Sequence, residues 1–182
     1  LTQSEIDESR NYLNSFIKND GRKIWTLIMG GPTKYYDYST KNMKHIFTSL
    51  YKLIKKHDFQ LVLIPSMRTP ANAIDYANKF FGSENLVIQN VDKKAYLSGL
   101  SIAKFLVVTC DSTSMISEAA LTGKPIYVAQ IPSKRDDHRF RQFRDLFSKL
   151  NIIKNLNNSL EIWKYEKLDE TNRIANLIKQ KL

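Results

Sequence analysis

Five short apolar segments recur along the chain, and a stretch whose apolar residues have helical spacing follows each of them. Most of these segments do not alternate polar with apolar residues, which is typical of strands covered on both faces of a parallel sheet. The expected pairs of strand and helix are 24–29 with 40–56, 60–64 with 70–81, 86–88 with 95–103, 105–109 with 112–121, and 125–129 with 140–150. The alternation predicts an α/β fold, a Rossmann-like three-layer α/β/α sandwich with a mostly parallel sheet.

The two ends of the chain add helices to this alternation. Apolar residues at helical spacing predict a helix over 4–18, and the turn residues 19–21 (Asn-Asp-Gly) end it. A loop is expected over the asparagine-rich residues 155–158. A closing helix is expected from Asp169 onward. Its inward-facing residues are expected to be Ile174, Leu177, Ile178 and Leu182.

Length and composition favour one folded domain over residues 1–182. A chain of 182 residues with 42% hydrophobic residues is long enough and apolar enough to bury a core of its own. The single cysteine, Cys110, excludes an internal disulfide framework and favours a reducing, cytoplasmic compartment. No apolar run approaches the roughly 20 residues of a membrane span, and the polar N-terminus does not resemble a signal peptide. Because the first residue is Leu1 rather than Met, we expect the chain to be a piece of a longer protein.

The net charge of +10 favours anionic partners, but its distribution narrows the choice. Twenty of the 28 basic residues are lysines scattered along the chain, which is typical of a solvated surface. The segment Lys134–Arg144 is denser and has the charge for peripheral contact with phosphate or an anionic membrane. With neither a clustered basic face nor an aromatic stacking platform, the sequence predicts no specific nucleic-acid partner.

The loop after the fourth expected strand carries the strongest binding signal. Ser112, Thr113 and Ser114 lie at the start of the next helix, where free backbone N–H groups and the helix dipole favour an anion. Glu118 lies four residues beyond Ser114, on the same helix face, and could accept both hydroxyls of a ribose. The alternative is that Asp111 or Ser112 only caps the helix and that Glu118 is solvated.

Two other loops at the same expected sheet edge have chemistry that suits phosphate. Gly30 and Gly31 follow the first strand and would let the backbone come close to a phosphate, although a simple tight turn is the commoner reason for a glycine pair. Arg68 follows the second strand and could bind phosphate with two N–H groups, or form a surface salt bridge instead. Because all three loops lie at the carboxyl ends of parallel strands, their coincidence predicts a nucleoside diphosphate as the ligand.

Other kinds of site are not supported by the sequence. Cys110 has no identifiable histidine partner and is expected to be an inert, buried residue. The three histidines, His45, His57 and His138, lack the spacing of metal ligands. The sequence therefore predicts no metal site, no resident cofactor and no catalytic residue within this chain.

Several stretches, in a fixed order that spans nearly the whole chain, are similar to one protein family. They are Gly30-Gly31 and the ranges 66–70, 108–119, 122–125, 139–143, 163–165 and 168–175. The most specific is the Asp-Ser-x-Ser-Met-x-Ser-Glu-Ala segment of residues 111–119. In these stretches the chain resembles the bacterial and plant proteins named after the elongated-mitochondria, or mitochondrial-fission, phenotype of a plant member.

The resemblance implies a fold, a ligand and a set of residue roles. That family looks like the GT-B class of glycosyltransferases, in which two Rossmann-like domains face each other and the C-terminal one binds the nucleotide sugar. The present chain would be this C-terminal half, and the acceptor domain, the usual source of the catalytic base, would precede Leu1. The family roles then fall on Gly30, Gly31, Ser112 and Ser114 for the diphosphate and on Glu118 for the ribose. Further contacts to base or sugar are expected from Tyr96, Met115 and Arg139.

Departures from the family pattern affect the base contact. Lys94-Ala95-Tyr96 stands where the family usually has Asn-Pro-Tyr, so Tyr96 alone of the three remains.

Two functions follow as hypotheses. The first is a nucleotide-sugar-binding domain of a metal-independent, GT-B-like glycosyltransferase, inactive without its acceptor domain. The second is a non-enzymatic interaction module of the mitochondrial-fission type that binds a protein partner or an anionic membrane through its basic face.

Overall fold

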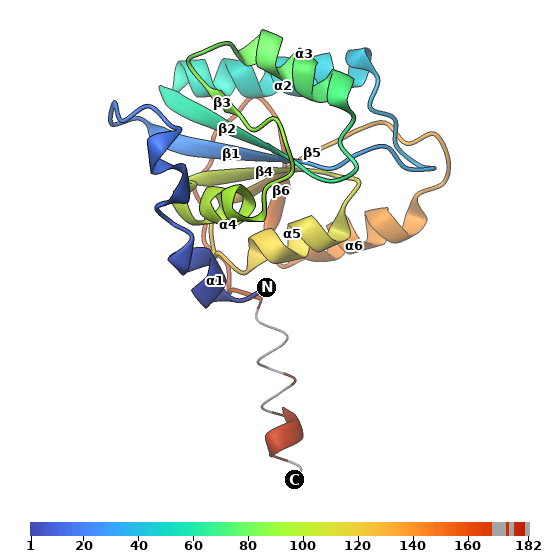
Figure 1. Ribbon diagram of the computed structural model, residues 1–182. Coiled ribbons are helices and arrows are strands. Elements are labelled where there is room, and N and C mark those ends of the chain that lie inside the picture. Colours follow the sequence, from blue (N-terminus) through green and yellow to red (C-terminus); the bar gives the residue numbers. More distant parts are fainter. Residues whose placement is uncertain (169–173, 175–176, 181–182) are drawn as a thin grey trace.

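A six-stranded sheet in which every strand is parallel to its neighbours forms the centre of the molecule. A computed structural model describes residues 1–168, 174 and 177–180. The strands occur in the order β3-β2-β1-β4-β5-β6 (Figure 1). Their bounds are β1 Lys23–Met29, β2 Phe59–Pro65, β3 Leu86–Val87, β4 Phe105–Thr109, β5 Ile126–Ala129 and β6 Ile153–Asn155. The Rossmann-like α/β fold is thus confirmed, with one strand more than the sequence predicted.

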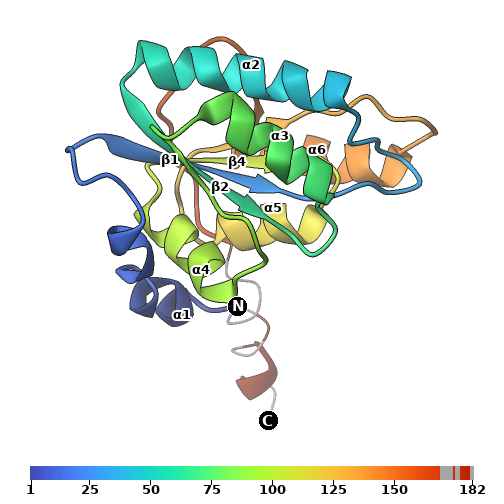
Figure 2. The same ribbon diagram turned by 45° about the horizontal axis from the view of Figure 1, so that its top comes forward.

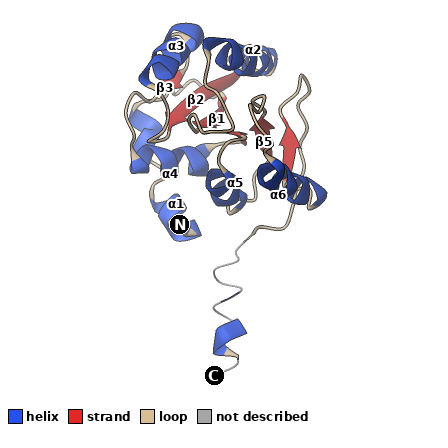
Figure 3. Cartoon of the chain, turned by 90° about the vertical axis from the view of Figure 1, so that its right-hand side faces the viewer, coloured by secondary structure: helices blue, strands red, loops and turns tan. Residues whose placement is uncertain are grey.

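Helices cover both faces of this sheet, as right-handed crossovers require. One layer holds α2 (Thr40–Lys56) and α3 (Ala71–Phe81), and the opposite layer holds α4 (Lys93–Ile102), α5 (Thr113–Ala120) and α6 (His138–Lys149). Figures 1 and 2 show α2 and α3 above the strands, and Figure 3 shows the three layers end on. Among the described residues, no helix is long and apolar enough to cross a bilayer.

The central strands are buried on both faces, which explains their unbroken apolar sequences. Trp25 of β1 lies at the centre of an aromatic cluster, with ring centroids 5.7 Å from Phe59, 5.2 Å from Phe105 and 5.7 Å from Tyr127. These side chains come from four neighbouring strands and are all buried. The cluster therefore fixes the mutual register of β2, β1, β4 and β5.

Side-chain caps position the helices next to the sheet. Ser39 accepts a hydrogen bond from Asn42 N at the start of α2, and Asp92 accepts hydrogen bonds from Lys94 N and Ala95 N at the start of α4. At the other end of α4, Lys124 Nζ donates to the carbonyl oxygens of the last turn, including Leu100 O at 2.7 Å. Lys124 of the predicted family stretch thus serves as a C-terminal cap.

The helix predicted over 4–18 is wrong as a single element. The structure has α1 over Gln3–Glu8 and a separate 3₁₀ helix, η1, over Tyr12–Ser15. Ser98 of α4 separates them, because its hydroxyl accepts from Leu13 N at 3.2 Å and donates to Arg10 O at 3.1 Å. These two backbone groups therefore bond to α4 instead of to a continuous helix.

The C-terminal part of the chain also differs from the prediction. β6 starts two residues before the expected asparagine loop and pairs with β5, with Ile153 opposite Ile126. Three residues expected to face inward from the closing helix, Ile174, Leu177 and Ile178, are about half exposed. Leu182 and the start of that helix at Asp169 lie outside the described residues.

Candidate functional site

The strand order places the loops after β1 and β4 side by side at the carboxyl edge of the sheet. The chain runs from β1 outward to β3 in one direction and from β4 outward to β6 in the other. This reversal between β1 and β4 is the topological switch point, where open α/β sheets bind their ligands. The glycine pair follows β1, and residues 110–114 follow β4. Two of the three predicted loops therefore flank the switch point.

Both N–H groups of the glycine pair are occupied by neighbours in the protein. Gly30 N donates to Thr109 Oγ1 at 2.8 Å, and Gly31 N donates to Asp111 Oδ2 at 3.1 Å. A Cβ on Gly30 would lie 2.2 Å from Asp111 Oδ2, and a Cβ on Gly31 would lie 2.0 Å from the carbonyl oxygen of Arg68. The close backbone approach expected from the glycines thus occurs against Asp111 and Arg68.

Arg68 spans the space between the loops after β1 and β4. Its Nη1 donates to Gly31 O at 3.0 Å, and its Nη2 donates to Asp111 Oδ2 at 2.9 Å. The Arg68 side chain is 44% exposed, whereas the Asp111 side chain is fully buried. The ion pair is therefore not a surface salt bridge between two solvated groups, because only its Arg68 side is exposed to solvent.

Asp111 is the centre of the hydrogen-bond network below Arg68. Tyr38 Oη donates to Asp111 Oδ1 at 2.6 Å and lies 2.9 Å from Thr109 Oγ1. Burial, together with the negative charge of Asp111, raises the pKa of Tyr38 well above its ordinary value, so the phenol remains a donor. The network holds the β1 and β4 loops in fixed relative positions.

The start of α5 provides free donors next to this network. Ser112 is the N-cap and accepts from Met115 N at 3.4 Å, as the capping alternative expected. Among the described residues, the backbone N–H groups of Thr113 and Ser114 have no acceptor. Ser114 is exposed, and its hydroxyl lies 3.2 Å from that of Ser112. This helix start can therefore donate to an anion.

A cleft of about 360 Å³ extends from the loop after β2 to α4 and α5. Three predicted contact residues, Tyr96, Met115 and Glu118, line it together with Ser66 and Met67. Glu118 Oε2 accepts from Tyr96 Oη at 2.5 Å. Burial and this hydrogen bond raise the pKa of Tyr96 above its ordinary value, which keeps the phenol protonated. Glu118 is thus held in the cleft.

Arg139 and the basic segment around it lie apart from this cleft. Arg139 is exposed on α6 and is not among the residues that line the cleft. Two other arginines of the segment are engaged with buried Asp137: Arg141 Nη1 at 2.8 Å and Arg144 Nη2 at 3.1 Å. The basic surface expected over Lys134–Arg144 is accordingly reduced, because Arg141 and Arg144 are paired with Asp137.

The two loops that follow β1 and β5 are joined to each other. Tyr36 and Ser133 form an antiparallel bridge, and Lys134 N donates to Tyr35 O at 2.7 Å. Tyr36 Oη also donates to Asp137 Oδ2 at 2.6 Å. Figure 1 shows both loops projecting side by side beyond the sheet. Their exposed cations are Lys34, Lys134 and Arg135.

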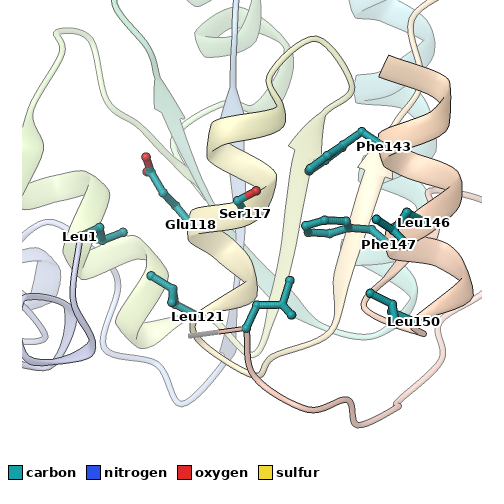
Figure 4. A pocket seen from close by; sticks show the side chains of 9 residues that line it. Leu1, Ser117, Glu118, Leu121, Phe143, Leu146, Phe147 and Leu150 are labelled. Atoms are coloured by element: carbon teal, nitrogen blue, oxygen red, sulfur yellow. The ribbon is translucent and has the colours of Figure 1, made fainter. Parts of the chain in front are cut away.

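A second hollow, of about 500 Å³, lies between α5 and α6. Its lining is mostly apolar, with Leu121 on the α5 side, Phe143 and Phe147 on α6, and Leu150 directly after α6 (Figure 4). Glu118 lines both this groove and the cleft described above, and Figure 4 shows its side chain on the far side of α5 from Phe143. α5 therefore separates two hollows whose linings are both mostly apolar, the cleft beside α4 and the groove beside α6.

Cys110 is fully buried, and burial raises its pKa to about 11, so its thiol remains protonated at neutral pH. Its Sγ accepts a hydrogen bond from Ile131 N at 3.2 Å. Within the part of the chain that the structure describes, no group of three or more His, Cys, Asp or Glu side chains is arranged to hold a metal ion.

Sequence reasoning missed the buried half of the site. Tyr38 and Thr109 were not predicted as site residues, and Asp111 was considered only as a helix cap. Tyr38 lies in a loop with no motif of its own, so its role depends on a partner 73 residues away. For Asp111 the sequence did contain an indication. Asp111 directly precedes Ser112, which already caps α5, so an aspartate at position 111 is not needed as a helix cap.

Comparisons with known proteins agree with the fold. A family model described as mitochondrial fission ELM1 matches residues 1–182. An uncharacterised protein of Rickettsia prowazekii (strain Madrid E) is 26% identical over 166 residues, which cover 87% of this chain and 46% of that protein. The mitochondrial fission protein ELM1 of Arabidopsis thaliana is 25% identical over 159 residues, covering 85% of this chain and 36% of that protein. The chain thus spans less than half the length of either relative.

Solved structures with a similar fold include two that were determined with UDP bound. The UDP-GlcNAc 2-epimerase of Methanocaldococcus jannaschii, in complex with UDP-GlcNAc and UDP, has a TM-score of 0.58 at 16% identity, covering 96% of this chain and 49% of that one. S. aureus MnaA, in a co-structure with UDP, has a TM-score of 0.56 at 19% identity, covering 85% of this chain and 41% of that one. At these identities the similarity concerns the fold.

Proposed function

The chain belongs to the mitochondrial fission ELM1 family, and from this premise we propose that it binds the nucleoside diphosphate part of a nucleotide sugar. The observation that carries the proposal is the meeting of two anion-binding features at the switch point. The N–H groups of Thr113 and Ser114 at the start of α5 have no acceptor within the described part of the chain, and Arg68, whose side chain is 44% exposed, pairs with Asp111 at the same sheet edge. The dipole of α5, the backbone N–H groups at its start and the positive charge of Arg68 together favour the binding of a diphosphate.

In the proposed complex, the diphosphate contacts the start of α5. The N–H groups of Thr113 and Ser114 and the hydroxyls of Ser112 and Ser114 donate to its oxygens, and Arg68 adds a charge-assisted contact. Gly30 and Gly31 contribute indirectly, because only residues without a Cβ leave room for Asp111 and Arg68 in their observed places.

The nucleoside would occupy the cleft between α4 and α5. Glu118 has its Oε2 bonded to Tyr96, and its second oxygen is available for a ribose hydroxyl. Met115 and Met67 supply apolar surface for a planar base. Arg139 has no part in this arrangement, because it does not line the cleft.

The reaction that this domain would serve is glycosyl transfer of the GT-B type. Arg68 and the α5 start would stabilise the negative charge that develops on the departing diphosphate, without need of a metal ion. No residue of the cleft is assigned as the catalytic base, and we propose that a further domain supplies it. Two facts support this: fold neighbours include structures solved with UDP, and the chain spans less than half the length of its relatives.

Thermal unfolding with and without nucleotide tests the proposal. UDP or GDP at about ten times its Kd should stabilise the chain by roughly 1.4 kcal/mol, a rise in Tm of about 3–6 °C. Glu118→Ala should abolish that rise. Tyr96→Phe removes the hydrogen bond to Glu118 but keeps the carboxylate, so it should retain most of the rise. Glu8→Ala, an exposed carboxylate on α1, is the matched control. No rise with any nucleoside diphosphate at millimolar concentration would refute the proposal.

The second candidate function, a basic interaction module, retains one favourable observation. Lys34, Lys134 and Arg135 are exposed together on the joined loops, whereas Arg144 is partly buried and paired with Asp137. Binding to vesicles of anionic lipid should then be lost in a Lys134→Glu/Arg135→Glu variant and survive Glu118→Ala. Equal binding by the double variant and the wild type would exclude this surface.

A further inference from the structure

The buried carboxylate of Asp111 accepts from three donors, two in the loop after β1 and one in the loop after β2. Oδ1 accepts from Tyr38 Oη at 2.6 Å, and Oδ2 accepts from Gly31 N at 3.1 Å and from Arg68 Nη2 at 2.9 Å. The Asp111 side chain has no exposed surface and Tyr38 is 6% exposed, so neither can touch a ligand that lies outside the loops. A helix cap would need none of these contacts.

We propose that Asp111 and Tyr38 are positioning residues that hold Arg68 for binding of the diphosphate. The inference rests on the proposed function, because it assigns these two residues a task at that same site. Arg68 is held at two points, Gly31 O and Asp111 Oδ2, which occupy two of its five N–H groups. The remaining N–H groups belong to a guanidinium whose plane is fixed. A fixed plane is what a two-pronged contact with phosphate oxygens requires.

The charge of Asp111 and its positioning effect act in opposite directions on an anion. As a negative charge near the site, Asp111 repels a diphosphate, so its neutralisation in Asp111→Asn would tighten binding if charge were its main contribution. As the anchor of Arg68, it favours binding, so the same substitution would weaken binding if positioning dominated. The sign of the change therefore distinguishes the two effects.

Tyr38→Phe isolates the positioning effect without a change of charge. It removes the 2.6 Å hydrogen bond to Oδ1 and keeps the ring that fills the core. Asp111 then loses the donor that fixes its rotation, and Arg68 loses a fixed partner. The affinity for UDP should fall by about 3- to 10-fold, the range that one hydrogen bond of ordinary strength controls.

The experiment measures the affinity of the 182-residue chain for UDP, uridine and pyrophosphate by NMR titration. Tyr38→Phe and Asp111→Asn should weaken UDP and pyrophosphate and leave uridine unchanged, because only the phosphate end depends on Arg68. Tyr76→Phe is the matched control, since Tyr76 packs on Phe47 in the α2–α3 layer with ring centroids 5.6 Å apart, away from the network. Far-ultraviolet circular dichroism confirms that each variant is folded.

A double-mutant cycle shows whether Tyr38 acts through Arg68. In an Arg68→Ala background, Tyr38→Phe should have no further effect on UDP affinity, whereas independent effects would multiply. The inference would be overturned if the two substitutions in the cycle acted independently. It would also be overturned if Tyr38→Phe and Asp111→Asn bound UDP as tightly as the wild type. Either result would leave the proposed function intact. A wild-type chain that binds neither UDP nor pyrophosphate would overturn both. If Asp111→Asn does not fold, Tyr38→Phe and the cycle still decide.

Discussion

Two adjacent glycines, Gly30 and Gly31, follow the end of β1. At each of them the absence of a Cβ makes room for a residue of the candidate site. Gly31 lies against the backbone of Arg68, and Gly30 lies against the carboxylate of Asp111. Neither has a positive φ, so conformational freedom is not the reason for glycine at these positions. Close packing of the two loops is the reason, because a side chain at either position would separate β1 from the network around Asp111.

Gly31→Ala should therefore damage both stability and binding. Its Cβ would lie 2.0 Å from a backbone oxygen, which has no rotamer to escape to, so we expect a loss of about 1–3 kcal/mol in the free energy of unfolding and a displaced Arg68. Urea denaturation and UDP titration measure the two effects. Gly21→Ala is the control: its φ of +82° makes alanine costly by about 1 kcal/mol, but it is remote from the site. Unchanged UDP affinity in Gly31→Ala would contradict this account of the glycine pair.

At the same scale, the sequence reveals the exposed half of the site better than the buried half. Arg68, Ser114 and Glu118 are recognisable because strand ends and helix starts concentrate donors and charges at predictable positions. Tyr38 could not be recognised, because its contact with Asp111 depends on how the ten-residue loop between β1 and α2 folds back toward the end of β4. Local sequence patterns do not show whether a loop folds back in this way.

At the scale of elements, Asp137 ties α6 to the loop after β1. Its Oδ2 accepts from Tyr36 and from Arg144, and its Oδ1 accepts from Arg141. Arg144 also donates to Cys110 O at 3.2 Å, so α6 is fastened to the end of β4 as well. Burial alone would raise the pKa of Asp137, but the hydrogen bonds from Tyr36 and Arg144 outweigh burial and hold the pKa below its ordinary value.

The stability that Asp137 contributes should consequently depend on pH. A carboxyl with a lowered pKa in the folded state contributes fully above its ordinary pKa of 3.8 and loses that contribution as the pH falls through the folded value. Asp137→Asn should lower the free energy of unfolding by about 3 kcal/mol at neutral pH, and this difference should shrink below about pH 4. Urea denaturation near pH 6 and near pH 3 measures it. Asp136→Asn, at an exposed neighbour, should change little at either pH. A pH-independent difference would exclude an ionised Asp137 as the cause.

The elements that could be predicted are those whose signal lies within one segment. α2 has the bounds expected from its apolar spacing, Thr40–Lys56, and Ser39 caps its start. β6 was missed because three residues beside an asparagine-rich loop are too few to show a pattern, and its strand character comes from pairing with β5. The break between α1 and η1 was missed for a similar reason, since Ser98 is distant in sequence.

At the scale of the whole molecule, the strand order determines which parts of the sheet open last. β1 and β4 are central and buried on both faces, whereas β3 and β6 are edge strands of two and three residues. Amide hydrogen exchange should therefore be slowest in β1 and β4, at free energies close to that of global unfolding, and faster in β3 and β6. Mass spectrometry of exchanged fragments checks this order. Equal protection across all six strands would indicate a sheet that opens only as one unit.

The pairing of β1 with β4 has a consequence for how the chain could be divided into two fragments that reassemble. Residues up to β3 carry the glycine pair, Tyr38 and Arg68, and residues from β4 onward carry Asp111, the start of α5 and Glu118. A cut of the polypeptide between β3 and α4 would give two fragments, each holding one half of the network across the β1–β4 seam. Reassembly of the fragments would restore the buried ion pair, and a diphosphate that bridges both halves would promote it. Reassembly of the two fragments along the contact between β1 and β4 would then report the binding of a diphosphate.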